Sequence, residues 1–381
     1  MQDLVRQELA TSANLIVVKV GTRVLTQSDG TLDTSRIQGL AEQIHQLRVS
    51  GRKVVLISSG AVGAGMSQLG LTERPNELSQ LQAVAAIGQT NLIEVYDSTF
   101  QRHGTHAAQV LLTAEDLNDR GRYLNVRNTL LALLEMDAVP IVNENDTVAV
   151  DELMLTFGDN DRLAALVTTA IRAPLLIILS DVDGLFDGHP QHERSQVIHT
   201  VKQIDTSIER LVSDESNALS RGGMRSKLEA ARMATKAGEN VIIASGHQPN
   251  VLPRLLSGEQ LGTAFLAEGK MVSPLKRWIG FSARPKGKLI LDDGACAALA
   301  YGGRSLLPIG IADVLGQFEK GDAVQLCNSS GVEVARGLTN YTSEQVLRIK
   351  GLQTGQIKGI LGHCPYAEVV HRDNMAITQA Q

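Results

Sequence analysis

The feature that most constrains the fold is a series of short apolar runs with almost no polar alternation. Strands of this kind are buried on both faces of a sheet. Amphipathic stretches with helical spacing separate the runs, as between Ile37 and Leu47. Six runs are predicted strands: Leu15–Val20, Lys53–Ser58, Ala107–Leu112, Ala138–Val142, Pro174–Leu179 and Asn240–Ala244.

The segments between these runs are predicted helices, besides the one between Ile37 and Leu47. They are Leu78–Phe100, Tyr123–Met136, Asp161–Ile171 and Met224–Ala237. Alternating strands and helices give a mostly parallel sheet covered on both faces, so we expect a three-layer α/β sandwich. Ligands of such sheets bind beyond the carboxyl ends of the strands, so the residues after each strand should carry the chemistry.

The character of the chain changes after residue 267. Residues 268–285 contain two prolines and several charges, which predicts a linker. Short apolar runs punctuated by glycine follow, and they predict a small, mostly β domain over residues 286–381. The expected organisation is therefore a domain at 1–267, a linker at 268–285 and a second domain at 286–381.

The charge balance argues against nucleic acid as the main partner. Residues 1–267 carry 23 Lys or Arg against 31 Asp or Glu, whereas phosphate contacts need a basic surface. Residues 286–381 carry nine of each sign. Only 3% of the residues are aromatic, which disfavours a platform for stacking bases.

Cysteine usage and the apolar runs indicate the compartment. Cys296, Cys327 and Cys364 have no metal-ligand spacing and are odd in number, which argues against disulfides and a zinc site and for a reducing cytosol. The N-terminal residues lack the pattern of a signal peptide, and no apolar run is long enough to cross a membrane. We therefore expect a cytoplasmic protein.

A lysine interrupts the first apolar run. Lys19 lies in Leu15–Val20 and is followed at once by Gly21 and Thr22. A lysine in a buried strand is costly unless a group of opposite charge pairs with it, and a phosphate would do so. The alternative is a lysine that reaches solvent from an edge strand.

The second run ends in "SSGAVGAG", Ser58–Gly65. A strand that stops at Ser-Ser-Gly and enters a helix offers free backbone N–H groups, which form an anion site. Small residues let a ligand approach the backbone closely. The alternative is a plain turn between strand and helix.

Two polar clusters follow the fourth run. They are "NENDTV", Asn143–Val148, and Gly158–Asp161, which opens a helix. Together they suit a ligand with an ammonium group and carboxylates, because Asp binds the cation and amides bind the anions. The alternative for Asn160 or Asp161 is a helix N-cap.

Two further segments suggest a nucleotide. In "LSDVDGLF", Leu179–Phe186, Asp181 and Asp183 suit a metal-bound nucleotide, although a tight turn at Gly184 is the alternative. In "SRGGMRSK", Ser220–Lys227, two glycines precede a lysine, but the spacing is not that of a P-loop and no strand precedes it. This segment is either a phosphate loop of another kind or a flexible turn.

Taken together, these motifs resemble the amino acid kinase superfamily, and most closely its branch that phosphorylates the side-chain carboxylate of L-glutamate. The resemblance covers essentially the whole chain. The segment after Lys286 resembles a PUA domain, down to "SLLPIGI" at Ser305–Ile311 and "HRDNM" at His371–Met375. The motifs in chain order are Lys19-Gly21-Thr22, Ser59-Gly60, Asn143–Asp146, Gly158–Asp161, Ser180-Asp181 and Gly222–Lys227.

The resemblance implies transfer of phosphate from ATP, with Mg2+, to L-glutamate, giving L-glutamyl 5-phosphate in the first step of proline biosynthesis. The nucleophile is an ionised carboxylate, so no general base is required. By resemblance, Lys19 and Lys227 are catalytic, and Ser59, Asp146 and Asn160 bind glutamate. The implied ATP-binding residues are Lys19, Ser180, Asp181, Arg221, Gly222, Gly223, Met224, Arg225, Ser226 and Lys227.

The resemblance also implies partners, and alternatives stay open for the substrate and for the role of the tail. It implies proline as a feedback inhibitor, with Thr113–Asn125 as the segment we expect to be involved, and a homo-oligomer. Aspartate or acetylglutamate is the alternative substrate. The PUA-like tail is expected to serve structure or oligomerisation, with weak RNA binding as the alternative.

Overall fold

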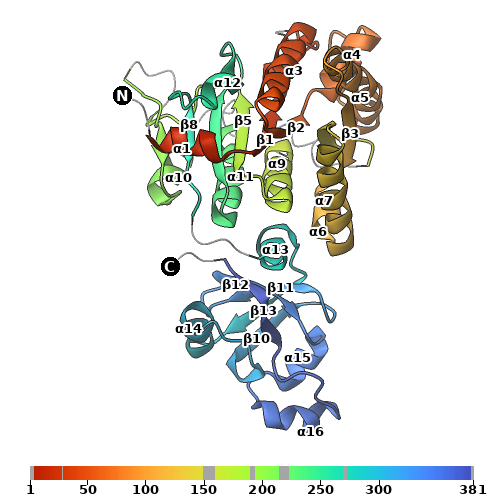
Figure 1. Ribbon diagram of the computed structural model, residues 1–381. Helices are drawn as coiled ribbons and strands as arrows, with labels where there is room; N and C mark the ends of the chain where they lie inside the picture. The colour runs from red at the N-terminus through yellow and green to blue at the C-terminus, as the bar shows by residue number, and fades with distance from the viewer. Residues whose placement is uncertain are drawn as a thin grey trace. The chain divides into compact units, whose positions relative to one another are not determined.

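The computed structural model describes residues 4–27, 29–148, 159–188, 194–213, 223–268 and 273–378 (Figure 1). The chain forms two compact units, each with a sheet of its own. The first unit comprises Met1–Leu117 and Gly121–Met271, and the second comprises Asn118–Arg120 and Val272–Gln381. The exact domain boundaries predicted at 267/268 and 285/286 stay a prediction.

The first unit is built on an eight-stranded sheet in the order β3-β4-β2-β1-β5-β7-β8-β6. All neighbouring strands are parallel except β7 and β8. The mostly parallel sheet and the six strands of the prediction are confirmed, whereas β6 and β8 are too short to give a pattern. The strands are β1 (Leu15–Val20), β2 (Lys53–Ser58), β3 (Ala107–Leu112), β4 (Val139–Glu144), β5 (Leu175–Ser180), β6 (Thr200–Val201), β7 (Asn240–Ser245) and β8 (Thr263–Phe265).

Helices cover both faces of this sheet, with α3 and α12 on one side and α9 and α11 on the other (Figure 1). The three-layer α/β architecture is therefore confirmed. The helices are α1 (Leu4–Ser12), α2 (Thr22–Leu25), α3 (Thr34–Val49), α4 (Ala61–Leu69), α5 (Leu78–Gln101), α6 (Ala114–Asn118), α7 (Arg120–Glu135), α9 (Asp159–Ile171), α10 (Thr206–Ser213), α11 (Gly223–Ala237) and α12 (Val251–Leu255).

Strand β1 occupies the middle of the sheet and divides its side chains between the two faces. Ile16, Val18 and Val20 join the apolar core formed with α3 and α5. Because side chains alternate along a strand, Val17 and Lys19 point to the opposite face, where α9 packs against β1. Lys19 is thus in a central strand, which excludes the alternative of a lysine at the sheet's edge.

The second unit contains a five-stranded sheet in the order β10-β9-β11-β12-β13. Its own apolar core includes Leu289, Val324, Leu326 and Val370. The elements are α13 (Pro274–Arg277), a π-helix (Trp278–Ser282), β9 (Gly287–Leu291), α14 (Asp293–Gly302), a 3-10 helix (Pro308–Gly310), β10 (Ile311–Gly316), β11 (Ala323–Cys327), β12 (Glu333–Thr339), α15 (Ser343–Ile349), a second 3-10 helix (Thr354–Gln356), α16 (Ile357–Leu361) and β13 (Val370–Ile377). The prediction of a small, mostly β region in this part of the chain is confirmed.

Candidate active site

The loops that follow β1, β2 and β5 meet at the carboxyl edge of the first unit's sheet. The backbone N–H of Gly21 donates to the carbonyl oxygen of Leu179 at 3.1 Å. The N–H of Ser59 donates to the carbonyl oxygen of Val20 at 3.2 Å. These bonds bring the segments after three strands together, at the edge where parallel sheets bind ligands.

Asp161 links the two lysines that the sequence singled out. Its Oδ1 lies 2.7 Å from Lys19 Nζ, and its Oδ2 lies 3.3 Å from Lys227 Nζ. The Oγ of Ser226 donates a hydrogen bond to the same Oδ2 at 2.8 Å. All three charged side chains are buried, with 7%, 10% and 2% of the side chain exposed for Lys19, Lys227 and Asp161.

The charges of Lys19, Asp161 and Lys227 shift the pKa values within this cluster. Burial by itself raises the pKa of Asp161, but the positive charges of Lys19 and Lys227 outweigh it, and the net shift is downward. Burial lowers the pKa of the Lys227 ammonium, while Asp161 opposes that shift. Two cations share one carboxylate, so the cluster presents a net positive charge to an anionic ligand.

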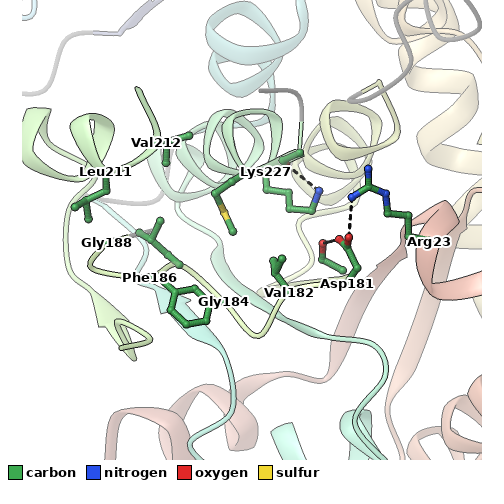
Figure 2. A pocket seen from close by; sticks show the side chains of 13 residues that line it. Arg23, Asp181, Val182, Gly184, Phe186, Gly188, Leu211, Val212 and Lys227 are labelled. Carbon is green, nitrogen blue, oxygen red and sulfur yellow. Dashed lines mark hydrogen bonds and ion pairs between the residues drawn. The ribbon is translucent and has the colours of Figure 1, made fainter. Parts of the chain in front are cut away.

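A cavity of about 140 Å³ opens beside Lys227. Figure 2 shows Lys227, Arg23 and Asp181 at one end of it, and Phe186, Leu211 and Val212 at the other. The cavity is therefore charged at one end and apolar at the other, which suits a ligand with a phosphate group and an aromatic base.

The charged end of this first cavity is ordered by hydrogen bonds. The Nη1 of Arg23 donates to Oδ2 of Asp181 at 2.9 Å, and the Ser180 hydroxyl donates to Oδ1 at 3.0 Å (Figure 2). Burial raises the pKa of Asp181, but these two donors outweigh it, and the carboxyl is held below its usual range. Asp181 is thus ionised at neutral pH.

The segment Gly223–Lys227 contributes side chains to the first cavity. Gly223 is the first residue of α11, and Met224 and Lys227 line the first cavity with it. Lys227 Nζ also donates to the carbonyl oxygen of Gly223 at 2.9 Å. Arg225 instead forms an exposed ion pair with Glu229, while Arg221 and Gly222 lie outside the described residues.

A second cavity of about 370 Å³ is lined in part by residues of α2 and of the first turn of α4. Thr22 lines this cavity, whereas its neighbour Arg23 lines the first. The three residues predicted to bind the acceptor, Ser59, Asp146 and Asn160, all line it. The structure thus brings them together, although they are far apart in the sequence.

Asn160 fixes one wall of the second cavity. Its Nδ2 donates to Ser59 Oγ at 3.0 Å and to Asn143 Oδ1 at 3.1 Å. Gly60 follows Ser59 as the N-cap of α4, and its φ of 106° is the left-handed conformation that glycine adopts readily. Ala61, Val62 and Gly63 of the first turn of α4 line the cavity, and the anion site predicted for Ser58–Gly65 stays a prediction.

Asp146 is the buried carboxyl of the second cavity. Burial raises its pKa to about 6, against the hydrogen bond from Gln89 and the positive charge of Arg74, which both lower it. The Nε2 of Gln89 lies 3.4 Å from Asp146 Oδ2. At neutral pH the carboxyl is ionised and suits a positively charged ligand group.

Sequence reasoning left several residues of the site out of its candidate set. Asp161 entered it only as part of the Gly158–Asp161 motif or as an N-cap, yet it holds both lysines. The available signal was Lys19 itself, because a buried lysine requires a buried partner. Arg23 and Arg74 gave no signal, since an arginine in a polar loop is ordinary.

The described residues contain no group of three or more His, Cys, Asp or Glu side chains that could hold a metal ion. Within the same residues, no helix has the length and apolar character of a membrane span.

Residues 14–245 match the family description "Amino acid kinase family", and residues 287–361 match "PUA domain". The first match covers more than half of the sequence, and the chain belongs to the amino acid kinase family. The family and the PUA tail predicted from the motifs are thus confirmed.

The chain is also similar to curated proteins along nearly its full length. It is 48% identical over 373 residues to the glutamate 5-kinase of Rhodopirellula baltica, covering 98% of this chain and 96% of that relative. It is 47% identical to the glutamate 5-kinase of Thioalkalivibrio sulfidiphilus, with 98% and 99% covered. For that of Caldanaerobacter subterraneus subsp. tengcongensis the identity is 46%, with 96% and 98% covered.

Proposed function

We propose that this protein acts as a glutamate 5-kinase, which transfers the γ-phosphoryl group of ATP to the side-chain carboxylate of L-glutamate. The product is L-glutamyl 5-phosphate, in the first step of proline biosynthesis. The observation that carries the proposal is the pair of cavities lined by the adjacent residues Thr22 and Arg23. Lys227 lines the first cavity and is joined to Lys19 through Asp161. Similarity to glutamate 5-kinases over nearly the whole chain supports it.

The reaction follows from the charges at this place. A γ-carboxylate oxygen of glutamate attacks the γ-phosphorus, the bond from that phosphorus to the β–γ bridging oxygen breaks, and ADP leaves. The attacking carboxylate is already ionised, so the enzyme needs to position two anions and neutralise the transferred charge. Lys19 and Lys227 supply the positive charge, and Asp161 holds both ammonium groups in place.

The second cavity is the proposed acceptor site. Asp146 binds the ammonium group of glutamate, and Ser59 and Asn160 bind carboxylate oxygens together with the N–H groups that open α4. This site accepts an amino acid through one buried negative group and several hydrogen-bond donors. It leaves the γ-carboxylate facing the loop after β1.

The first cavity is the proposed ATP site. The apolar end around Phe186 receives the base, and the phosphates face Lys227 and the N-terminus of α11. We propose that the nucleotide is bound by the residues predicted for this role, which are Ser180, Asp181 and Gly223–Lys227. The same role is proposed for Arg221 and Gly222, which lie outside the described residues. Glycine at 222 and 223 is proposed to let the backbone approach the nucleotide.

Mg2+ is proposed to accompany ATP. A bound magnesium ion is usually held by substrate phosphates, water and one or two carboxylates. Asp181 fits that role, because its ionised carboxylate lines the charged end of the first cavity. When bound, the ion would neutralise phosphate charge alongside the lysines.

Regulation by proline is a further proposal. Proline is proposed as an inhibitor that acts at or near the glutamate site. The segment singled out for this, Thr113–Asn125, contributes none of the described residues that line either cavity. In it, Asp116 accepts hydrogen bonds from Thr113 and Arg122. If proline inhibits Asp116→Asn as strongly as the parent, this segment has no such role.

Fewer observations support the proposals on assembly, on the role of the tail and on the compartment. A homo-oligomer and a structural role for the PUA-like tail are proposed, with weak RNA binding by the tail as the alternative that a gel shift tests. A cytoplasmic location is supported by the free thiols of Cys296, Cys327 and Cys364.

The function is tested by ADP release from Mg-ATP with glutamate, aspartate, acetylglutamate or bicarbonate plus ammonia as separate acceptors. Hydroxylamine traps the acyl phosphate product, and the assay is repeated with proline. We expect turnover with glutamate that falls when proline is added. Turnover with another acceptor, or with none, would contradict the assignment of glutamate.

A further inference from the structure

The second cavity contains one positively charged side chain among the described residues that line it. That residue is Arg74, in the connection between α4 and α5. Two carboxyl groups, Asp29 and Asp146, line the same cavity. The proposed reaction does not use Arg74, and the cation has no role in the ATP site, because it lines only the second cavity.

Arg74 and Asp146 line the same cavity without forming an ion pair. The positive charge of Arg74 acts to lower the pKa of Asp146, although burial raises it overall. In the described part of the chain, no salt bridge within 4.0 Å joins them, and Arg74 makes none with another described carboxylate. The Arg74 side chain is exposed, while Asp146 is buried.

This arrangement matches the head group of an α-amino acid. The ammonium and the carboxylate of such a molecule are attached to one carbon atom, so their binding groups must be near neighbours of opposite charge. They must also be far enough apart for the head group to enter between them. Asp146 and Arg74 carry opposite charges, line one cavity and form no direct ion pair, and a guanidinium is suited to bind a carboxylate through two parallel hydrogen bonds.

We propose that Arg74 binds the α-carboxylate of the acceptor substrate and makes the site selective for acceptors that carry this group. The inference rests on the proposed glutamate 5-kinase function and adds a specificity-determining residue to it. Asp146 binds the ammonium group, Arg74 binds the α-carboxylate, and the γ-carboxylate is left to react. An acceptor without the α-carboxylate lacks the partner of Arg74.

The test compares L-glutamate with L-isoglutamine, in which a neutral amide replaces the α-carboxylate and the reacting γ-carboxylate is unchanged. We expect Arg74→Ala to lower kcat/KM for glutamate about tenfold or more, chiefly through KM, because a charge-assisted contact is lost at a partly solvated site. We expect the same variant to change kcat/KM for isoglutamine less than about threefold.

Two controls separate a charge effect from damage to the loop. Arg74→Lys keeps the charge but loses the paired hydrogen bonds, so it should recover part of the glutamate activity. Glu73→Ala alters the neighbouring exposed residue, which does not line the cavity, and should act on both substrates like the parent protein. The glutamate KM of the parent should rise with salt more steeply than that of Arg74→Ala.

Equal losses for glutamate and isoglutamine, or no loss for either, would overturn the role of Arg74. Calorimetric binding of the two compounds distinguishes this failure from failure of the proposed function. If the parent binds glutamate through Arg74 but does not phosphorylate it, the function is wrong and the inference stands. If the parent binds no glutamate, both are wrong.

Discussion

At the scale of single residues, Asp161 explains how two lysines can be buried in one small region. An isolated buried ammonium group is strongly unfavourable, and removing one partner of a buried ion pair costs about 3–5 kcal/mol. Asp161 compensates Lys19 and Lys227 at once and receives a further hydrogen bond from Ser226. The sequence predicted a phosphate as the partner of Lys19, whereas the structure places a carboxylate there that also fixes the position of the ammonium group.

Lys227→Ala should lower kcat by about 10²–10³, because it removes one of the two cations that we propose neutralise the transferred phosphoryl group. Steady-state kinetics with saturating Mg-ATP and glutamate measures the effect. Lys202→Ala, which removes an exposed lysine of the same unit, serves as the control and should keep the parent kcat. A kcat within twofold of the parent in Lys227→Ala would exclude a role in the chemical step.

Asp146 should make glutamate binding sensitive to pH. Its pKa is raised by burial to about 6 in the folded protein, and only the ionised carboxylate binds an ammonium group. We therefore expect kcat/KM for glutamate to fall about tenfold per pH unit below pH 6. In Asp146→Asn this acid limb should vanish and the value at pH 7 should already be low; an unchanged limb would assign it to another group.

The same shift has the opposite effect on stability. The folded-state pKa of about 6 lies above the ordinary value of 3.8, so the folded protein binds more protons between these values. The free energy of unfolding contributed by Asp146 therefore decreases as the pH rises from about 4 to 6. Bound glutamate offsets this, because its ammonium group compensates the ionised carboxylate.

At the scale of elements, a close crossing of α4 and α5 positions the start of α4 at the second cavity. The crossing depends on glycine on both helices. A Cβ at Gly65 would lie 1.9 Å from the carbonyl oxygen of Val84, and one at Gly88 would lie 1.8 Å from that of Ala61. Backbone atoms are the obstacle in both cases, so no side-chain rotation relieves the contact.

Gly65→Ala should destabilise the protein by about 1–3 kcal/mol or more, because the added methyl group forces α4 and α5 apart. It should also raise the KM for glutamate, since residues of α4 line the proposed acceptor site. Gly39→Ala is a matched control on the exposed side of α3, where an added Cβ meets nothing within 4 Å. That change should be neutral or stabilise by up to about 1 kcal/mol in chemical unfolding; equal losses in both variants would refute the argument.

At the scale of the whole molecule, the two units have separate apolar cores, and every described residue of the candidate site belongs to the first. The candidate site thus depends on the core of the first unit, and the tail depends on the core of the second. The tail's stability should therefore be separable from catalysis.

Leu326→Ala should destabilise the second unit by about 2–5 kcal/mol, because Leu326 is fully buried in its core. At a temperature where the variant is still folded, we expect the parent kcat and KM, whereas thermal unfolding followed by circular dichroism should begin earlier. Leu56→Ala, the matched change in the core of the first unit, should lower stability there and reduce activity on warming. A reduced kcat in folded Leu326→Ala would show that the tail contributes to the site.

The amino-acid sequence by itself determined six strands of the first sheet, its mostly parallel order and the family. These follow from local patterns, because unbroken apolar runs and 3.6-residue spacing are properties of neighbouring residues. The position of Lys19 within such a run also indicated that a group of opposite charge must pair with it.

Only the tertiary structure decided which side chains meet. Asp161 contacts both lysines, Arg74 lines the second cavity with Asp146, and Arg23 pairs with Asp181 over 158 positions of sequence. No local pattern marks such contacts, since they depend on how the sheet orders its strands and on the helix packing that sets the distances. The sequence determines which groups are present, and the packing of the folded chain determines their electrostatic environment and therefore their chemistry.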